Sequence, residues 1–150
     1  MNDPTLAGTI QAGLAEAIVA QTPDAIVFSD REGVIRLWNR GAEVLFGFAA
    51  SEAVGASLDI IIPERFRAAH WAGFRRAVAA GQVRHGARVR TTRAIHRFGH
   101  KLYVELSFAL VHDRSGAVIG SVAVGRDCSD RYLGEKAMRE RLAQLERTAT

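Results

Sequence analysis

The feature that most constrains this fold is a series of three strand-like segments in the second half of the chain, at about residues 83–96, 101–112 and 117–126. Short turns that contain glycine join them, Arg97-Phe98-Gly99-His100 and Asp113-Arg114-Ser115-Gly116. Connections this short link antiparallel neighbours, because parallel strands need a crossover of about a dozen residues or more. The sequence therefore predicts an antiparallel sheet.

The rest of the chain supplies two more strands and several helices. The predicted strands are 25–29 and 34–38, and the predicted helices are about 5–20, 40–46, 64–80 and a last one, capped by Asp127 or Ser129, that runs to about Arg147. Asn39 is placed to cap the short helix and Gly47 to end it. Pro63 is placed to begin the longer helix and Gly81 to end it. Runs of strands separated from runs of helices indicate the α+β class.

Length and composition predict one globular domain with helical ends. The chain has 150 residues, of which 48% are hydrophobic and 24% charged. We expect an N-terminal amphipathic helix over 1–20, a domain over 21–131 and a C-terminal helix over 132–150. No apolar run approaches the roughly 20 residues that span a bilayer, and no signal peptide is evident. A lone cysteine, Cys128, excludes an internal disulfide, so the expected compartment is the cytoplasm.

Charge is distributed unevenly along the sequence. The segment 65–104 contains no Asp or Glu and holds ten of the 20 Lys and Arg residues, whereas the remainder has ten Lys or Arg against 16 Asp or Glu. This block indicates either a solvated basic face or a bound anion. Nucleic acid is not expected, because no helix-turn-helix, zinc finger or aromatic-rich RNA-binding pattern accompanies the charges.

Seven short blocks carry a family resemblance. They are Pro23-Asp24-Ala25-Ile26, Asp30-Arg31-Glu32-Gly33, Leu37-Trp38-Asn39-Arg40-Gly41-Ala42-Glu43, Phe46-Gly47-Phe48, Glu52-Ala53-Val54-Gly55, Ile62-Pro63 and Arg126-Asp127-Cys128-Ser129. Together they resemble bacterial PAS domains of the S-box type, over about residues 21–131. The resemblance implies the PAS fold, a five-stranded antiparallel sheet with helices on one face. Such domains sense ligands, light or redox state, or only dimerise.

One histidine lies on the apolar face of the predicted helix 64–80. Phe66, His70, Phe74 and Ala77 recur at helical spacing, so they share one face. His70 is then either a packed core histidine or a metal ligand. A single histidine cannot build a tetrahedral zinc site, but it suffices as the proximal ligand of haem, because the porphyrin supplies four nitrogens.

The segment Ile62-Pro63-Glu64-Arg65-Phe66-Arg67-Ala68-Ala69-His70 resembles the ligand-bearing helix of the haem PAS domains in rhizobial oxygen-sensing kinases. The resemblance implies b-type haem with His70 as the metal ligand and with a diatomic gas, O2, CO or NO, as the sensed molecule. It places Arg76 at a haem propionate and Arg90 at the gas-responsive position. The apolar surroundings would be Phe66, Phe74, Leu106 and Phe108.

Arg88 departs from that family pattern, because haem PAS domains have an apolar residue or methionine there. Two strand registers remain open. In one, Arg88 and Arg90 face the pocket and pair with haem propionates; in the other, Ala87, Val89 and Thr91 point inward and both arginines face solvent. His85, at the start of the same segment, is a further candidate for the distal pocket. Flavin is another PAS cofactor, but Cys128 lies outside the helical region where photoreactive PAS domains carry their cysteine.

The remaining expectations concern partners. No hydrolase, P-loop or zinc-protease motif is present, so an enzyme is not expected. After residue 130 an apolar stripe runs along the last helix, formed by Leu133, Ala137, Met138, Leu142 and Leu145. The stripe predicts a homodimer held by the terminal helices and one sheet face; the alternatives are a helix packed on its own domain or a frayed helix. The leading interpretation is a haem sensor that signals to an unidentified downstream protein. The alternative is a PAS dimerisation or interaction module without a cofactor.

Overall fold

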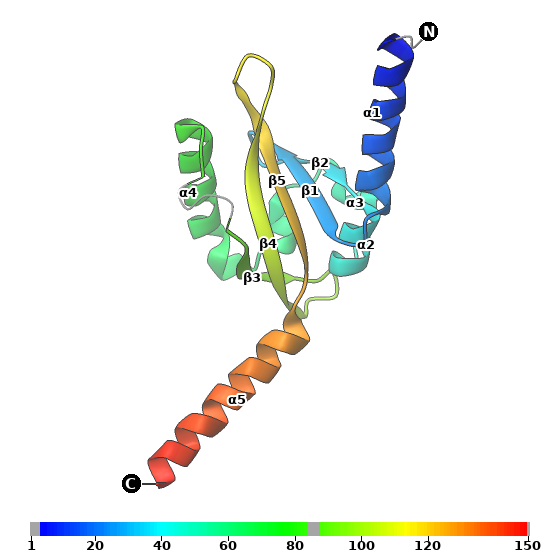
Figure 1. The fold of residues 1–150 in the computed structure, drawn as a ribbon. Helices are drawn as coiled ribbons and strands as arrows, with labels where there is room; N and C mark the ends of the chain where they lie inside the picture. Colours follow the sequence, from blue (N-terminus) through cyan, green and yellow to red (C-terminus); the bar gives the residue numbers. More distant parts are fainter. Residues whose placement is uncertain (1–3, 84–87, 150) are drawn as a thin grey trace.

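The computed structural model describes residues 4–83 and 88–149. In chain order its elements are α1 (Pro4–Gln21), β1 (Ala25–Asp30), β2 (Ile35–Trp38), α2 (Arg40–Phe46), α3 (Ala50–Ala53), a 3-10 turn (Leu58–Ile61), α4 (Glu64–Ala80), β3 (Arg90–Ile95), β4 (Lys101–His112), β5 (Val118–Asp127) and α5 (Ser129–Thr148) (Figure 1). The α+β class is confirmed.

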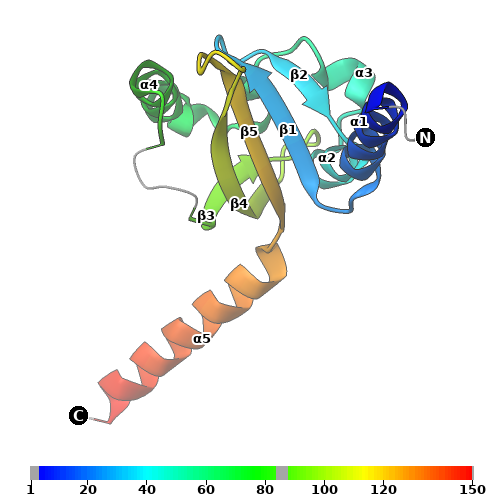
Figure 2. The ribbon, with the colours of Figure 1, turned by 45° about the horizontal axis from the view of Figure 1, so that its top comes forward.

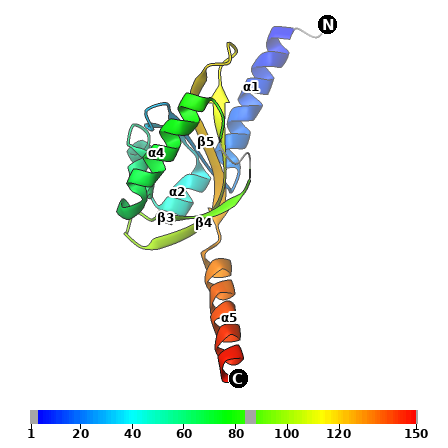
Figure 3. The same ribbon diagram turned by 90° about the vertical axis from the view of Figure 1, so that its left-hand side faces the viewer.

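The strands form one sheet in the order β2-β1-β5-β4-β3, and every neighbouring pair is antiparallel. β1 pairs with β5, so the N-terminal hairpin adds to the edge of the three C-terminal strands. Figure 3 shows α2 and α4 together on one side of the sheet. The predicted five-stranded antiparallel sheet with helices on one face is therefore confirmed.

Asn39 organises the junction of α1, β1 and α2. Its side-chain Oδ1 accepts hydrogen bonds from the backbone N–H groups of Ala42, at 2.9 Å, and Ile26, at 2.8 Å. Its Nδ2 donates to the carbonyls of Val19, at 2.8 Å, and Asp24, at 3.0 Å. The carboxamide thus caps α2, as predicted, and also ties α2 to two other elements.

α4 is attached to the rest of the domain in its middle and at its C-terminal end. The Trp71 indole Nε1 donates to the Asp59 carboxylate at 2.8 Å, and its ring lies against Gly33, where a β-carbon would collide with it. Gly81 ends the helix in the left-handed conformation, with φ 73°, and its carbonyl lies 3.2 Å from His112 Nε2 on β4. The predicted helix 64–80 is confirmed.

The predicted strand over 83–96 is wrong at its start. The structure has β3 only from Arg90, and Gln82, Val83, Arg88 and Val89 lie outside any strand. The chain leaves α4 beside His112, at the far end of β4, whereas Arg90 pairs with Leu106. Part of the predicted strand is therefore needed to connect the helix to the sheet.

The terminal helices differ in how they leave the domain. α5 projects away from the sheet, as Figure 2 shows, and is anchored to it near the start of the helix. There Tyr132 stacks on Tyr103 with ring centroids 4.0 Å apart, and Arg131 pairs with Glu105 at 3.3 Å. The stripe residues Leu133, Met138, Leu142 and Leu145 are each at least 50% exposed. The alternative that this helix packs on its own domain is wrong.

Candidate functional site

His70 lies on α4 among aromatic side chains. Its ring meets Trp71 edge-on at a centroid distance of 4.8 Å and Phe74 at 6.0 Å. Phe74 is buried, and His70 itself is half-buried. Within the residues that the structure describes, the buried Nδ1 of His70 has no hydrogen-bond partner. Such an unsatisfied buried nitrogen is uncommon and needs an explanation.

Burial lowers the pKa of His70 below its ordinary value, because the apolar surroundings disfavour the imidazolium ion. The Asp59 carboxylate opposes this shift but does not overcome it. That carboxylate is already engaged by Trp71 Nε1 at 2.8 Å and lies 3.9 Å from Arg67 Nε. The histidine is therefore neutral near pH 7, the form in which imidazole binds a metal.

The apolar residues predicted around His70 come from two elements. Phe66 and Phe74 lie on α4, and Leu106 and Phe108 lie on β4, where both are half-buried against the core. Leu106 pairs with Gly125 and Phe108 with Ala123 of β5, so both belong to one face of the sheet. Phe66 is half-buried nearer the start of α4.

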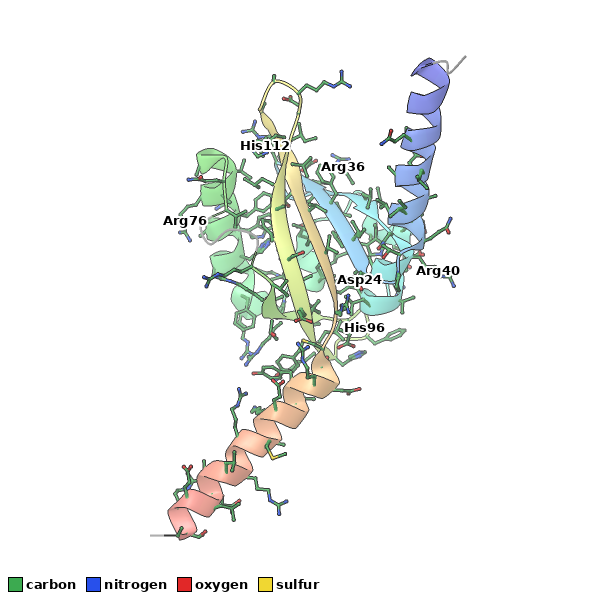
Figure 4. The ribbon with its side chains drawn as sticks, in the orientation of Figure 1. Asp24, Arg36, Arg40, Arg76, His96 and His112 are labelled. Carbon is green, nitrogen blue, oxygen red and sulfur yellow. The ribbon has the colours of Figure 1, made fainter. Side chains whose placement is uncertain are left out.

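The predicted arginines all lie at the surface. Arg76 is exposed on α4 and points away from the sheet in Figure 4. Arg88 is exposed and precedes β3. Arg90 is exposed as well, but it pairs with Leu106, and directly paired residues share a face. Among the described residues, no carboxylate forms an ion pair with these three arginines.

The strand register places Arg90 and Thr91 on opposite faces of the sheet, whereas Arg88 precedes β3 and is not placed by it. Arg90 shares the face of Leu106, whereas Thr91 pairs with Glu105 and belongs to the opposite face. Arg90 thus starts β3 on the face that carries the predicted apolar residues, without being buried there. His85 and Ala87 lie outside the described residues.

A pocket that the sequence did not predict opens between the start of α4 and the β3–β4 hairpin. Its volume is about 510 Å³, and it is lined by Pro63, Glu64, Arg65, Phe66, Arg93, Ala94, Ile95, Gly99 and Lys101. We call it the hairpin pocket. His70 is not among its lining residues. The acid-free block was the available signal, since Arg65, Arg93 and Lys101 belong to it.

The described residues do not form a cluster of side chains suited to hold a metal ion by themselves. No group of three or more His, Cys, Asp or Glu side chains converges within residues 4–83 and 88–149. This excludes a multi-ligand protein cage there but leaves a single imidazole available to a group that brings its own ligands.

Within residues 4–83 and 88–149, no helix is long and apolar enough to cross a membrane.

A profile of the PAS fold matches residues 13–128, which is most of the chain. The chain belongs to the PAS family. Its PAS fold resembles the PAS domain of a protein from Colwellia psychrerythraea, at 23% identity and a TM-score of 0.69, over 81% of this chain and 98% of that one. It also resembles an RNA-binding light-oxygen-voltage receptor, at 22% identity and a TM-score of 0.75, over 93% of this chain and 38% of that one.

Two curated relatives extend the comparison. An uncharacterised protein of Azorhizobium caulinodans is 30% identical over 137 residues, or 91% of this PAS chain and 18% of the relative. The sensor protein FixL of Bradyrhizobium diazoefficiens is 39% identical over 54 residues, or 36% of this chain and 11% of that protein. The chain thus spans less than a fifth of the length of either relative.

Proposed function

We propose that this PAS sensor domain binds b-type haem through His70 and senses a diatomic gas. The observation that carries the proposal is the buried Nδ1 of His70, which has no partner among the described residues. A neutral imidazole with an unused nitrogen, beside Trp71 and Phe74, has the donor chemistry that haem requires. The 54-residue similarity to a bacterial sensor protein supports the same assignment.

The residues present fit the group in their chemistry. His70 would be the metal ligand, and the apolar side chains of Phe74, Leu106 and Phe108 would contact the porphyrin. Arg90, which lacks a carboxylate partner within the described residues, would pair with a propionate. The propionate role expected for Arg76 is not part of the proposal, because Arg76 points away from the sheet. Haem iron, when bound, supplies reversible affinity for O2, CO or NO.

The protein's own contribution to signalling would begin at Arg90. A change in the hydrogen bonds of Arg90 acts on β3, where the Arg93 guanidinium lies 5.8 Å from the centroid of the Tyr103 ring. Tyr103 in turn stacks on Tyr132 of α5. The domain would thus bias α5 between two states, as a binding and signalling unit rather than an enzyme.

The first experiment is an absorption spectrum of the protein purified from cells supplied with a haem precursor. We expect a Soret band that shifts on reduction and on adding CO. His70→Ala should lose the band while keeping the circular dichroism of the wild type, and the matched His100→Ala variant, on the exposed hairpin, should keep both. Wild-type protein that is colourless and does not bind added haemin would overturn the proposal.

The alternative, an interaction module without a cofactor, is favoured by one observation. Leu14 and Ile18 of α1 are 57% and 59% exposed, and the stripe of α5 is exposed to a similar extent. Apolar surface of this kind marks protein contacts. We propose that a homodimer covers it, and a monomer in sedimentation at micromolar concentration would contradict that proposal. Trp38, a strand residue that could stack on flavin, is buried in the core with its Nε1 donating to the Phe48 carbonyl at 3.0 Å.

A further inference from the structure

The hairpin pocket combines an apolar floor with a cationic rim. Pro63, Phe66, Ala94 and Ile95 supply apolar surface, and Ala94 is only 5% exposed. The volume of about 510 Å³ lies within the range of small-molecule sites. His70, Leu106 and Phe108 do not line the pocket, and Phe66 is the one lining residue that also belongs to the surroundings predicted for haem.

Three cations surround Phe66 and its neighbours. The guanidinium carbons of Arg65 and Arg93 lie 4.7 Å and 5.8 Å from the centroid of the Phe66 ring. Lys101, at the start of β4, adds a third positive charge, and Glu64 is the single acid of the lining. In the part of the chain that the structure describes, none of the three cations forms an ion pair with a carboxylate.

An apolar floor beside three cations favours a ligand that has both an apolar body and a negative charge. A guanidinium binds a carboxylate through parallel hydrogen bonds, and a planar apolar body can cover Phe66 and Ile95. A neutral apolar molecule would leave the cations without a counter-charge, and a free inorganic anion would leave the apolar floor in water. We propose that the hairpin pocket binds a small aromatic carboxylate, with its ring on Phe66 and its carboxylate between Arg93 and Lys101.

A ligand in the hairpin pocket would also connect α4 with the β3–β4 hairpin. The lining joins the start of α4, the helix of His70, to both strands of the β3–β4 hairpin. The hairpin turn is itself fixed to α2 and α3, because the backbone N–H of Arg97 donates to the Phe46 carbonyl at 2.9 Å and its guanidinium pairs with Glu52 on α3. A ligand in the pocket therefore contacts α4 and a hairpin whose turn is anchored to the domain.

The test is an amide NMR titration of the full, haem-free chain with 2-naphthoate, with 2-naphthylmethanol as the neutral match. We expect saturable shifts at Phe66, Ala94, Ile95 and Gly99, and at least tenfold tighter binding of the acid. The double variant Arg93→Gln/Lys101→Gln should weaken naphthoate binding about tenfold or more, because both carboxylate contacts are lost.

The matched control is Arg114→Gln, which removes an exposed cation from the β4–β5 turn and should leave affinity unchanged. Shifts scattered over the basic surface, equal affinity for acid and alcohol, or no saturation up to about 10 mM would overturn the proposal. Because the readout is made without haem and away from His70, its outcome is independent of the Soret experiment.

Discussion

Two regions of the domain differ in whether their polar side chains have partners among the described residues. At the junction of α1, β1 and α2, the carboxamide of Asn39 makes four hydrogen bonds, two as acceptor and two as donor. On the side of α4 and β3, and within the described residues, the Nδ1 of His70 is buried without a hydrogen-bond partner and Arg90 is exposed without an ion-pair partner. The first arrangement stabilises the fold, whereas the second has unused binding capacity, which is why we assign ligands to that side.

The largest expected effect follows from removing the Asn39 hydrogen bonds at the junction of α1, β1 and α2. Asn39→Ala removes all four bonds and leaves the Ala42 and Ile26 N–H groups without their acceptor, so we expect the free energy of unfolding to fall by about 3 kcal/mol. Urea denaturation measures this. Asn39→Asp is the comparison variant: it keeps the acceptor but places a carboxylate oxygen against the Val19 and Asp24 carbonyls, so it should be destabilised as well. A loss below about 0.5 kcal/mol for Asn39→Ala would show that the network contributes little.

A smaller effect of opposite sign is expected at His70. In haem-free protein, His70→Leu replaces an unsatisfied nitrogen by an apolar group of similar size, and we expect stabilisation of about 1 kcal/mol. The control is His96→Leu, because the His96 Nδ1 accepts a hydrogen bond from the Phe98 N–H at 3.2 Å. That variant should be destabilised. Equal destabilisation of both variants in urea would mean that His70 has a partner in solution.

The pH dependence of stability sharpens the same contrast. The pKa of His70 is lowered by burial, so the unfolded chain takes up this proton at a higher pH than the folded domain. The contribution of His70 to stability is complete above its ordinary pKa of 6.5 and is lost as the pH falls through the folded value. The urea midpoint should therefore decrease between pH 7.5 and 5.5.

His70→Leu should flatten this decrease without abolishing it, because desolvation and the neighbouring His100 also lower the pKa of His96. An unchanged slope in that variant would show that His70 does not titrate differently in the folded and unfolded states. The measurement is a series of urea titrations at fixed ionic strength, so that screening of the surface arginines does not change with pH.

How much of the molecule the sequence predicts depends on how local each signal is. The caps at Asn39, Gly47 and Gly81 were predictable, because each acts within one helical turn. The start of β3 was not, since it depends on where α4 ends relative to β4. The hairpin pocket was missed for the same reason: segments 63–66 and 93–101 meet only in the folded domain. The acid-free block indicated an anion without locating it.

The smallest effect on stability, and the sharpest test of the unused side, concerns Arg90. Because Arg90 is exposed and without an ion-pair partner among the described residues, Arg90→Ala should leave the free energy of unfolding of haem-free protein within about 0.5 kcal/mol. In haem-loaded protein the same variant should keep the Soret intensity but change gas affinity, because Arg90 shares the face of Leu106. Arg114→Ala, on the exposed β4–β5 turn, should change neither quantity. Gas affinity equal to that of the wild type would show that Arg90 takes no part in the response.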